Sequence, residues 1–159
     1  MSQITNASVT RFGRRGPRRP HVRFRTRGAS LGLTASTTHS LVCQLEAGLP
    51  FRALQTLAAK SGVPAGSIAA TLRIPERTLA RRRVTGRFTP DESERLLRVS
   101  IMFEKAVRLF EGDVEAAVVW LTSPKKALLR QTPLAYSRTE LGAREVENLI
   151  GRLEHGVFS

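Results

Sequence analysis

The chain has 159 residues, one cysteine and a formal net charge of +13 at pH 7. This length is enough to bury a hydrophobic core without covalent cross-links, and the single thiol, Cys43, excludes an internal disulfide. No apolar run approaches the roughly 18 residues of a membrane-spanning helix. We therefore expect a cytoplasmic protein whose positive charge attracts a polyanion and that does not insert into a membrane.

The positive charge is confined to the first part of the sequence. Residues 1–40 carry eight basic and no acidic side chains, and residues 41–88 carry eight basic and two acidic ones. Residues 89–159 carry ten basic and eleven acidic side chains. This asymmetry predicts a nucleic-acid-binding part followed by a part with no electrostatic reason to contact phosphate.

Residues 1–35 contain eight arginines among glycine, proline, serine and threonine, with almost no periodic apolar residues. Such a segment buries too little surface to offset its ordering entropy, so we predict that it is disordered. Two interpretations stay open: a basic arm that adds salt-sensitive affinity for DNA, or a segment without function, as a solvated tail or as an artefact of an upstream start codon. An organellar leader is disfavoured because the segment lacks a clear amphipathic stripe.

Apolar residues at helical spacing begin near Ser36, and no strand-like alternation is present anywhere in the sequence. We predict an all-α fold with a DNA-binding region over residues 36–88. The stretch from Ile68 to Arg83 has the pattern of a helix-turn-helix, with Ile74 in the turn. Arg73 occupies the turn position where glycine is frequent, and a positive φ at a non-glycine residue costs about 1 kcal/mol.

The second helix of this motif is the candidate for reading DNA. Leu79 must face the core, which turns the neighbouring cationic and polar residues toward the opposite side or its flank. Arginine pairs with guanine in the major groove, and threonine contacts a thymine methyl or a phosphate. A solvated basic face is the alternative. The predicted base-reading residues are Arg77, Thr78, Arg81 and Arg82, and the predicted phosphate contacts are Arg83 and Arg87,.

Residues 89–159 are expected to form a second helical region. Thr89, Pro90 and Glu92 have the spacing of a capping box at the start of a long helix that runs to about Phe110,. Further helices are predicted from Val114 to Leu121, at a cap formed by Thr132 and Pro133, and from Thr139 onward,.

The sequence offers little for catalysis. His21, His39 and His155 are dispersed, and no metal-ligand spacing, glycine-rich phosphate loop or nucleophile elbow is present,. We therefore expect no enzymatic activity, no cofactor and no metal.

Three stretches, residues 77–82, 89–98 and 142–157, resemble the Xre/MbcA/ParS-type antitoxins, and within them the Xre-like antitoxins that pair with RES-domain toxins. The resemblance implies a dimeric antitoxin of a type II toxin–antitoxin system. It further implies that the N-terminal part represses its own operon by binding operator DNA. By the same resemblance, the C-terminal part, residues 89–159, is expected to dimerise and to cover the active site of a toxin that consumes NAD.

The resemblance places the toxin contacts near the C-terminus. We expect Arg144, Arg152 and Glu154 on the polar side of the last helix, and Val157, Phe158 and Ser159 as a tail that enters a cleft of the toxin. The alternative is a free-standing helix-turn-helix transcription regulator, whose C-terminal helices only dimerise or sense a ligand. A growth-inhibiting toxin in the adjacent reading frame distinguishes the two.

Overall fold

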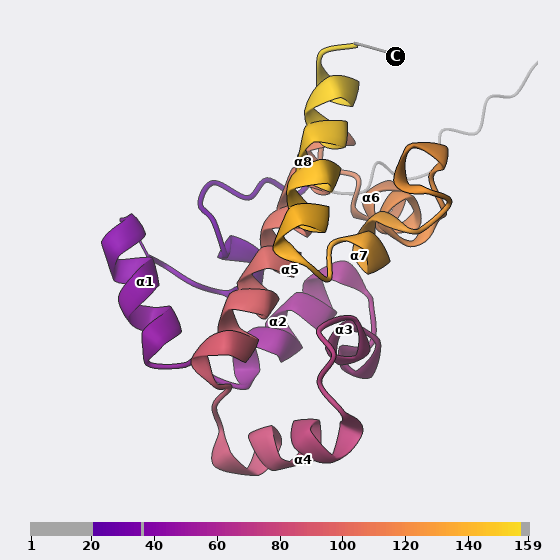
Figure 1. Ribbon diagram of the computed structural model, residues 1–159. Helices are drawn as coiled ribbons and strands as arrows, with labels where there is room; N and C mark the ends of the chain where they lie inside the picture. Colours follow the sequence, from indigo (N-terminus) through magenta and orange to yellow (C-terminus); the bar gives the residue numbers. More distant parts are fainter. Residues whose placement is uncertain (1–20, 36, 157–159) are drawn as a thin grey trace, which may run out of the picture.

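The computed structural model describes residues 21–35 and 37–156, and within these ranges every regular element is helical. Two short 3-10 turns, η1 and η2, accompany eight α-helices (Figure 1). The predicted all-α fold is confirmed. The helices are α1 Thr38–Glu46, α2 Arg52–Ser61, α3 Ala65–Thr71, α4 Glu76–Thr85, α5 Pro90–Leu109, α6 Val114–Thr122, α7 Pro133–Tyr136 and α8 Glu140–Glu154, and the 3-10 turns are η1 Ala29–Leu31 and η2 Lys126–Leu128.

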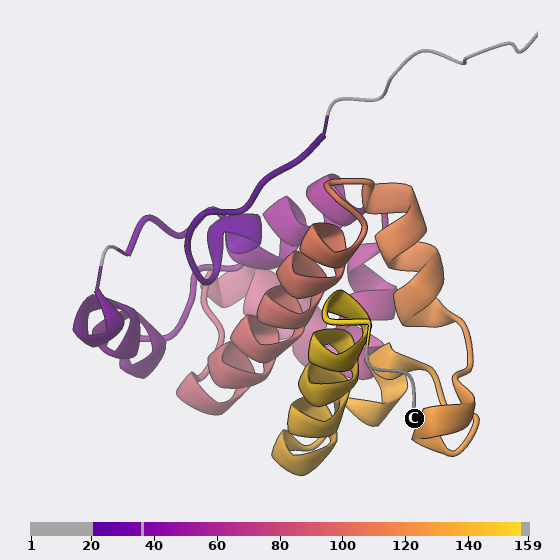
Figure 2. The ribbon, with the colours of Figure 1, turned by 90° about the horizontal axis from the view of Figure 1, so that it is seen from above.

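The long helix α5 is the centre of the molecule. Its N-terminus has the predicted capping box: the Thr89 side chain accepts from the Glu92 N–H, and the Glu92 side chain accepts from the Thr89 N–H. α2, α6 and α8 all contact α5, and α8 runs alongside it (Figure 2). Because α5 buries residues on several sides, it joins the helix-turn-helix to the C-terminal helices,.

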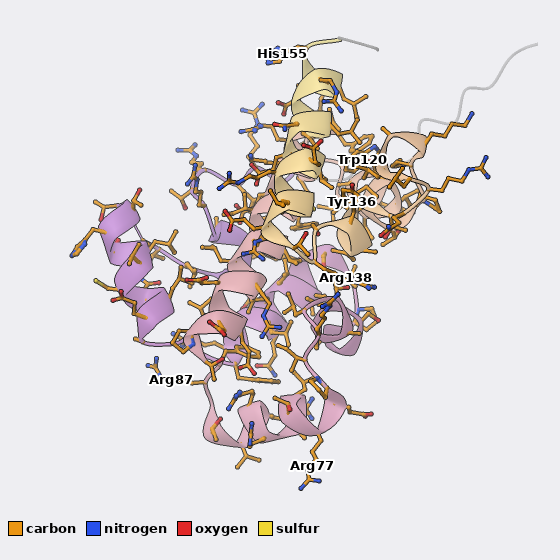
Figure 3. All side chains as sticks on the ribbon, in the orientation of Figure 1. Arg77, Arg87, Trp120, Tyr136, Arg138 and His155 are labelled. Carbon is orange, nitrogen blue, oxygen red and sulfur yellow. The ribbon has the colours of Figure 1, made fainter. Side chains whose placement is uncertain are left out.

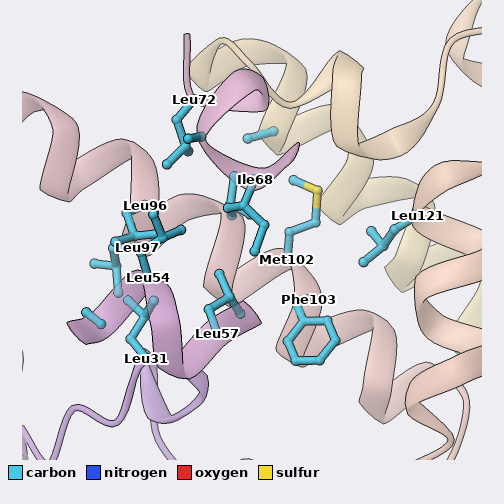
Figure 4. Packing of buried hydrophobic residues seen from close by; sticks show 14 of the residues in the cluster. Leu31, Leu54, Leu57, Ile68, Leu72, Leu96, Leu97, Met102, Phe103 and Leu121 are labelled. Carbon is cyan, nitrogen blue, oxygen red and sulfur yellow. The ribbon is translucent and has the colours of Figure 1, made fainter. Parts of the chain in front are cut away.

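The two halves of the chain share one hydrophobic core. Leu57 and Ile68 from the N-terminal helices lie close to Met102 and Phe103 of α5 and to Leu121 of α6 (Figure 4). Each of these five side chains is at most 4% exposed. The halves are therefore packed against each other, and the boundary predicted at residue 89 is not a flexible linker.

The segment 21–35 differs from the prediction of disorder. Phe24 packs on the ring of Phe103 at a centroid distance of 5.6 Å, and Leu31 is 2% exposed. The backbone N–H groups of Gly28 and Ser30 donate to the carboxylate of Glu104 at 3.2 and 2.7 Å. Because the chain is mostly extended here, its apolar residues do not recur at helical spacing. A prediction based on helical spacing therefore does not detect that they are buried. The rest of the predicted arm, residues 1–20, lies outside the described residues.

A close contact between backbones positions the start of α8. An ideal Cβ at Gly142 lies 1.9 Å from the carbonyl oxygen of Tyr136, so only glycine fits there. The Thr139 side chain accepts from the Gly142 N–H at 3.1 Å and caps the helix as predicted. Ion pairs then join α8 to α5, from Lys105 to Glu147 and from Arg108 to Glu154.

Candidate functional site

α3 and α4 form the predicted helix-turn-helix. Arg73 has a φ of 55°, which confirms the left-handed conformation expected at the turn. The turn is held by a hydrogen bond from the Ile74 N–H to the Ala69 carbonyl at 3.0 Å. The Arg95 guanidinium of α5 also donates to the Leu72 carbonyl at 2.7 Å. These bonds satisfy backbone groups that the turn leaves free, and the bond from Arg95 fixes the C-terminal end of α3 to α5,.

α4 lies at one end of the molecule and has one side open to solvent (Figure 1). Leu79 is 9% exposed and faces the core, as predicted. Arg77 and Arg81 are exposed on the other side, and Figure 3 shows Arg77 pointing away from the body of the protein. Thr78 is half-buried at the flank. Two arginines of the predicted base-reading set therefore stand free of the fold.

Arg82 is oriented differently from the prediction. Its Nε donates to Oε2 of Glu92 at 2.7 Å, and its Nη2 donates to Oε1 at 3.1 Å. The two side chains are only 16% and 7% exposed. Arg82 lies at about 60° from Leu79 around the helix axis, so it points toward α5 and not toward solvent. In this structure Arg82 holds α4 against α5, and it is not part of the open face.

This pair also changes the acidity of Glu92. Burial by itself opposes ionisation, but the hydrogen bonds from Arg82 and Thr89 and the charge of Arg82 outweigh it, and the pKa of Glu92 is lowered,. Glu92 is therefore ionised at neutral pH, and the pair is a bidentate, charge-assisted contact.

The two predicted phosphate contacts, Arg83 and Arg87, are exposed but bend back toward the protein. The Arg83 guanidinium lies 5.6 Å from the centre of the Phe51 ring. Nη1 of Arg87 donates to the carbonyls of Ala47 and Gly48 at 3.2 and 2.8 Å. Both contacts leave other guanidinium N–H groups available, so a phosphate contact by either residue stays a prediction.

The open face of α4 includes two apolar residues that the sequence reasoning did not select. Ala80 is exposed, and Val84 is 88% exposed. Together with Arg77 and Arg81 they are spaced three, four and seven residues apart, which places all four on one side of a helix. This spacing is present in the sequence, where the neighbouring run of arginines is the more prominent feature.

The outer face of α8 contains two of the six residues predicted to meet a toxin. Arg144 is exposed and pairs with Glu140 one turn earlier at 2.6 Å, and Arg152 is exposed near the end of the helix. Glu154 instead accepts from Nε of Arg108 at 3.2 Å, so it also joins α8 to α5. Val157, Phe158 and Ser159 lie outside the described residues.

Leu141 adds an apolar group to this outer face, where its side chain is 77% exposed. The C-terminal end of α8, marked by His155, lies far from Arg77 on α4 (Figure 3). The basic face of α4 and the C-terminal half of α8 are therefore separate surfaces. A macromolecule at one leaves space for another at the opposite end.

The part of the chain that the structure describes contains neither a cluster of metal-ligating residues nor a membrane-spanning helix. No group of three or more metal-ligating side chains comes together there, and none of its helices combines the length and apolar character needed to cross a membrane. Cys43 is exposed, and its sulfur lies 3.8 Å from Nε2 of His39.

Two domains of known families match successive parts of the chain. The antitoxin Xre-like helix-turn-helix domain matches residues 41–100, and the antitoxin Xre/MbcA/ParS C-terminal toxin-binding domain matches residues 105–156. A protein named Antitoxin Xre from Yersinia enterocolitica is 40% identical over 141 residues, which cover 88% of this chain and 95% of the relative. A second Antitoxin Xre, from Photorhabdus laumondii, is 37% identical over 131 residues, covering 82% and 88%.

Proposed function

This chain belongs to the Xre antitoxin family, and we propose that it inhibits a RES-domain toxin and represses the operon that encodes the pair. Membership in the family, with a DNA-binding and a toxin-binding domain, agrees with the resemblance seen in the sequence. The identity of the toxin, its consumption of NAD and autorepression are the proposal. The observation that carries it is the match of a toxin-binding domain to residues 105–156, the part of the chain with little net charge.

DNA binding is assigned to the open face of α4. Arg77 and Arg81 are exposed at the N-terminal and middle turns of the second helix of the motif, which is the helix that enters the major groove,. Each arginine can donate two hydrogen bonds to one guanine, and a bidentate contact contributes about 1–3 kcal/mol of discrimination. Because a dimer presents two such helices, we propose that a homodimer binds two half-sites upstream of its own reading frame.

Toxin binding is assigned to the outer face of α8 and the chain that follows it. Arg144 and Arg152 lie on that face, with Leu141 as an apolar contact. The ion pair of Glu154 with Arg108 keeps this end of α8 on α5, so Glu154 is proposed to position the helix that meets the toxin. An antitoxin of this kind acts through binding energy alone, and it needs no catalytic group.

The test is expression of the adjacent reading frame with and without this protein. We expect the neighbour alone to stop growth and to lower cellular NAD, and co-expression to restore both. The two proteins should also co-purify. A harmless neighbour that does not co-purify contradicts the toxin assignment and favours a free-standing regulator. A toxic neighbour that leaves NAD unchanged contradicts only the RES type.

A second experiment separates the two surfaces. The double variant Arg77→Ala/Arg81→Ala should lose operator binding and still neutralise the toxin, because the altered side chains make no contact with the C-terminal half. Arg152→Ala should weaken neutralisation and leave DNA binding unchanged, and Lys126→Ala, an exposed cation of η2, serves as its control. Loss of both activities in either variant contradicts separate surfaces.

A further inference from the structure

Val84 occupies an unusual place on α4. Among the large apolar side chains that the structure describes, it is the most exposed, at 88%. With about 100° between successive helical residues, Val84 and Arg77 point in nearly the same direction. Leu79, which is buried, lies about 140° away from Val84 around the axis,. Val84 is therefore near the middle of the face that points away from the protein.

The fold does not require a valine at this position. The helix ends at Gly86, whose N–H donates to the Arg82 carbonyl at 2.9 Å with a φ of 76°. The Thr85 hydroxyl lies 3.4 and 3.3 Å from the carbonyl oxygens of Arg82 and Arg87, respectively. The hydrogen bonds that end the helix therefore do not involve the Val84 side chain. A β-branched residue at this position slightly lowers helix stability.

The charges around Val84 identify its partner. Arg82 and Arg83 bend back to Glu92 and Phe51, so the residues nearest to Val84 on the open face are two cations, Arg77 and Arg81, and one further apolar residue, Ala80. A protein partner is disfavoured by the density of like charge, whereas DNA combines phosphate with one apolar group in the major groove. That group is the C5-methyl of thymine.

We propose that Val84, flanked by Ala80, reads the C5-methyl group of a thymine in the operator. This inference rests on the DNA binding proposed above and adds the base that the apolar part of α4 selects. Apolar side chains contact the thymine methyl in the major groove, while arginine pairs with guanine O6 and N7. The open face therefore reads two kinds of base with two kinds of side chain.

The spacing of the residues restricts where this thymine lies. Seven residues separate Val84 from Arg77, which is roughly 10 Å along a helix axis. Successive base pairs are about 3.4 Å apart along the DNA axis. The thymine contacted by Val84 is therefore expected within about three base pairs of the guanine contacted by Arg77, because any inclination of the helix to the DNA axis shortens this separation.

The test uses DNA in which uracil replaces thymine, because the two bases differ only in the C5-methyl group. The probe is the DNA upstream of the protein's own reading frame, prepared once with thymine and once with uracil. We expect the wild-type protein to bind the uracil probe about fourfold more weakly for each methyl group contacted. Val84→Ala should bind the thymine probe about fourfold more weakly per half-site, with little further loss on the uracil probe.

Val119→Ala is the matched control, because Val119 is a valine on α6 whose side chain is 58% exposed. It should bind both probes as the wild type does, and circular dichroism should show all three proteins equally folded. Equal wild-type affinity for the two probes overturns the inference. The inference is also overturned if replacing thymine with uracil weakens binding of Val84→Ala as much as it weakens binding of the wild type, because another side chain then reads the methyl group. Failure to bind either probe contradicts the proposed autorepression itself.

Discussion

Replacing Arg82 with alanine is expected to destabilise the fold, although the sequence places this residue in a run of arginines predicted to bind DNA. The guanidinium contacts both carboxylate oxygens of Glu92, at 2.7 and 3.1 Å, with the side chains 16% and 7% exposed. Removing one partner of a fully buried pair costs about 3–5 kcal/mol. Glu92 retains its hydrogen bond from the Thr89 N–H, so we expect a loss of about 2–3 kcal/mol,.

The free energy of unfolding is measured by urea denaturation, followed by circular dichroism. Arg81→Ala is the matched control, since Arg81 is adjacent but exposed, and its stability should change by less than about 0.5 kcal/mol,. Operator binding should behave in the opposite way and depend more on Arg81. If Arg82→Ala unfolds like the wild type and still fails to bind DNA, Arg82 acts on DNA directly and the structural role is refuted.

The same pair predicts a dependence of stability on pH. The pKa of Glu92 is lower in the folded protein than its ordinary value of 4.5, mainly because the Arg82 and Thr89 contacts outweigh the effect of burial. The stabilisation is therefore present above pH 4.5 and is lost as the pH falls through the folded-state pKa. The difference in unfolding free energy between wild type and Arg82→Ala should shrink over that range. A difference that is constant with pH contradicts an ionic interaction.

Three further changes test other parts of the structure. Burial raises the pKa of Glu104 above 4.5 despite the hydrogen bonds from Ser30, so the wild type loses stability as Glu104 ionises,. Glu104→Gln should therefore gain thermal stability relative to the wild type as the pH rises from 4.5 to 7. A difference in melting temperature between the two proteins that does not change with pH refutes this. Gly142→Ala should lose about 3 kcal/mol in urea denaturation, because its Cβ meets a backbone carbonyl, whereas Gly151→Ala in the same helix, with open space around it, should gain about 0.5–1 kcal/mol,. Similar effects of the two substitutions contradict the close contact. Arg73→Gly should raise the unfolding free energy by about 1 kcal/mol by relieving its positive φ, and no gain means that the turn is unstrained,.

Local signals in the sequence were sufficient for the fold class and for much of the helix organisation. The capping box at Thr89, the caps at Thr132 and Thr139, and the positive φ at Arg73 were all predicted. These features depend on residues within one or two turns of each other, so they can be recognised without knowing the tertiary structure. Burial of Leu79 was also predictable, because its place in the helical period requires it to face the core.

The extended segment 21–35 became visible only in the tertiary structure. Its order depends on Glu104, more than 70 residues away in the sequence, whose carboxylate accepts from the Gly28 and Ser30 backbone. An isolated stretch rich in arginine has the composition of a disordered chain. Contacts with α5 compensate for the entropy of ordering it, and composition cannot report such contacts.

The tertiary structure also gives different environments to the arginines of α4, which form a single run in the sequence. Arg81 and Arg82 are neighbours along the chain, yet one is open to solvent and the other is held by Glu92 of α5. The sequence showed where positive charge is concentrated and that a helix carries it. Which cations remain free depends on where the next helix places its carboxylate, and that position is set by the packing of α4 against α5.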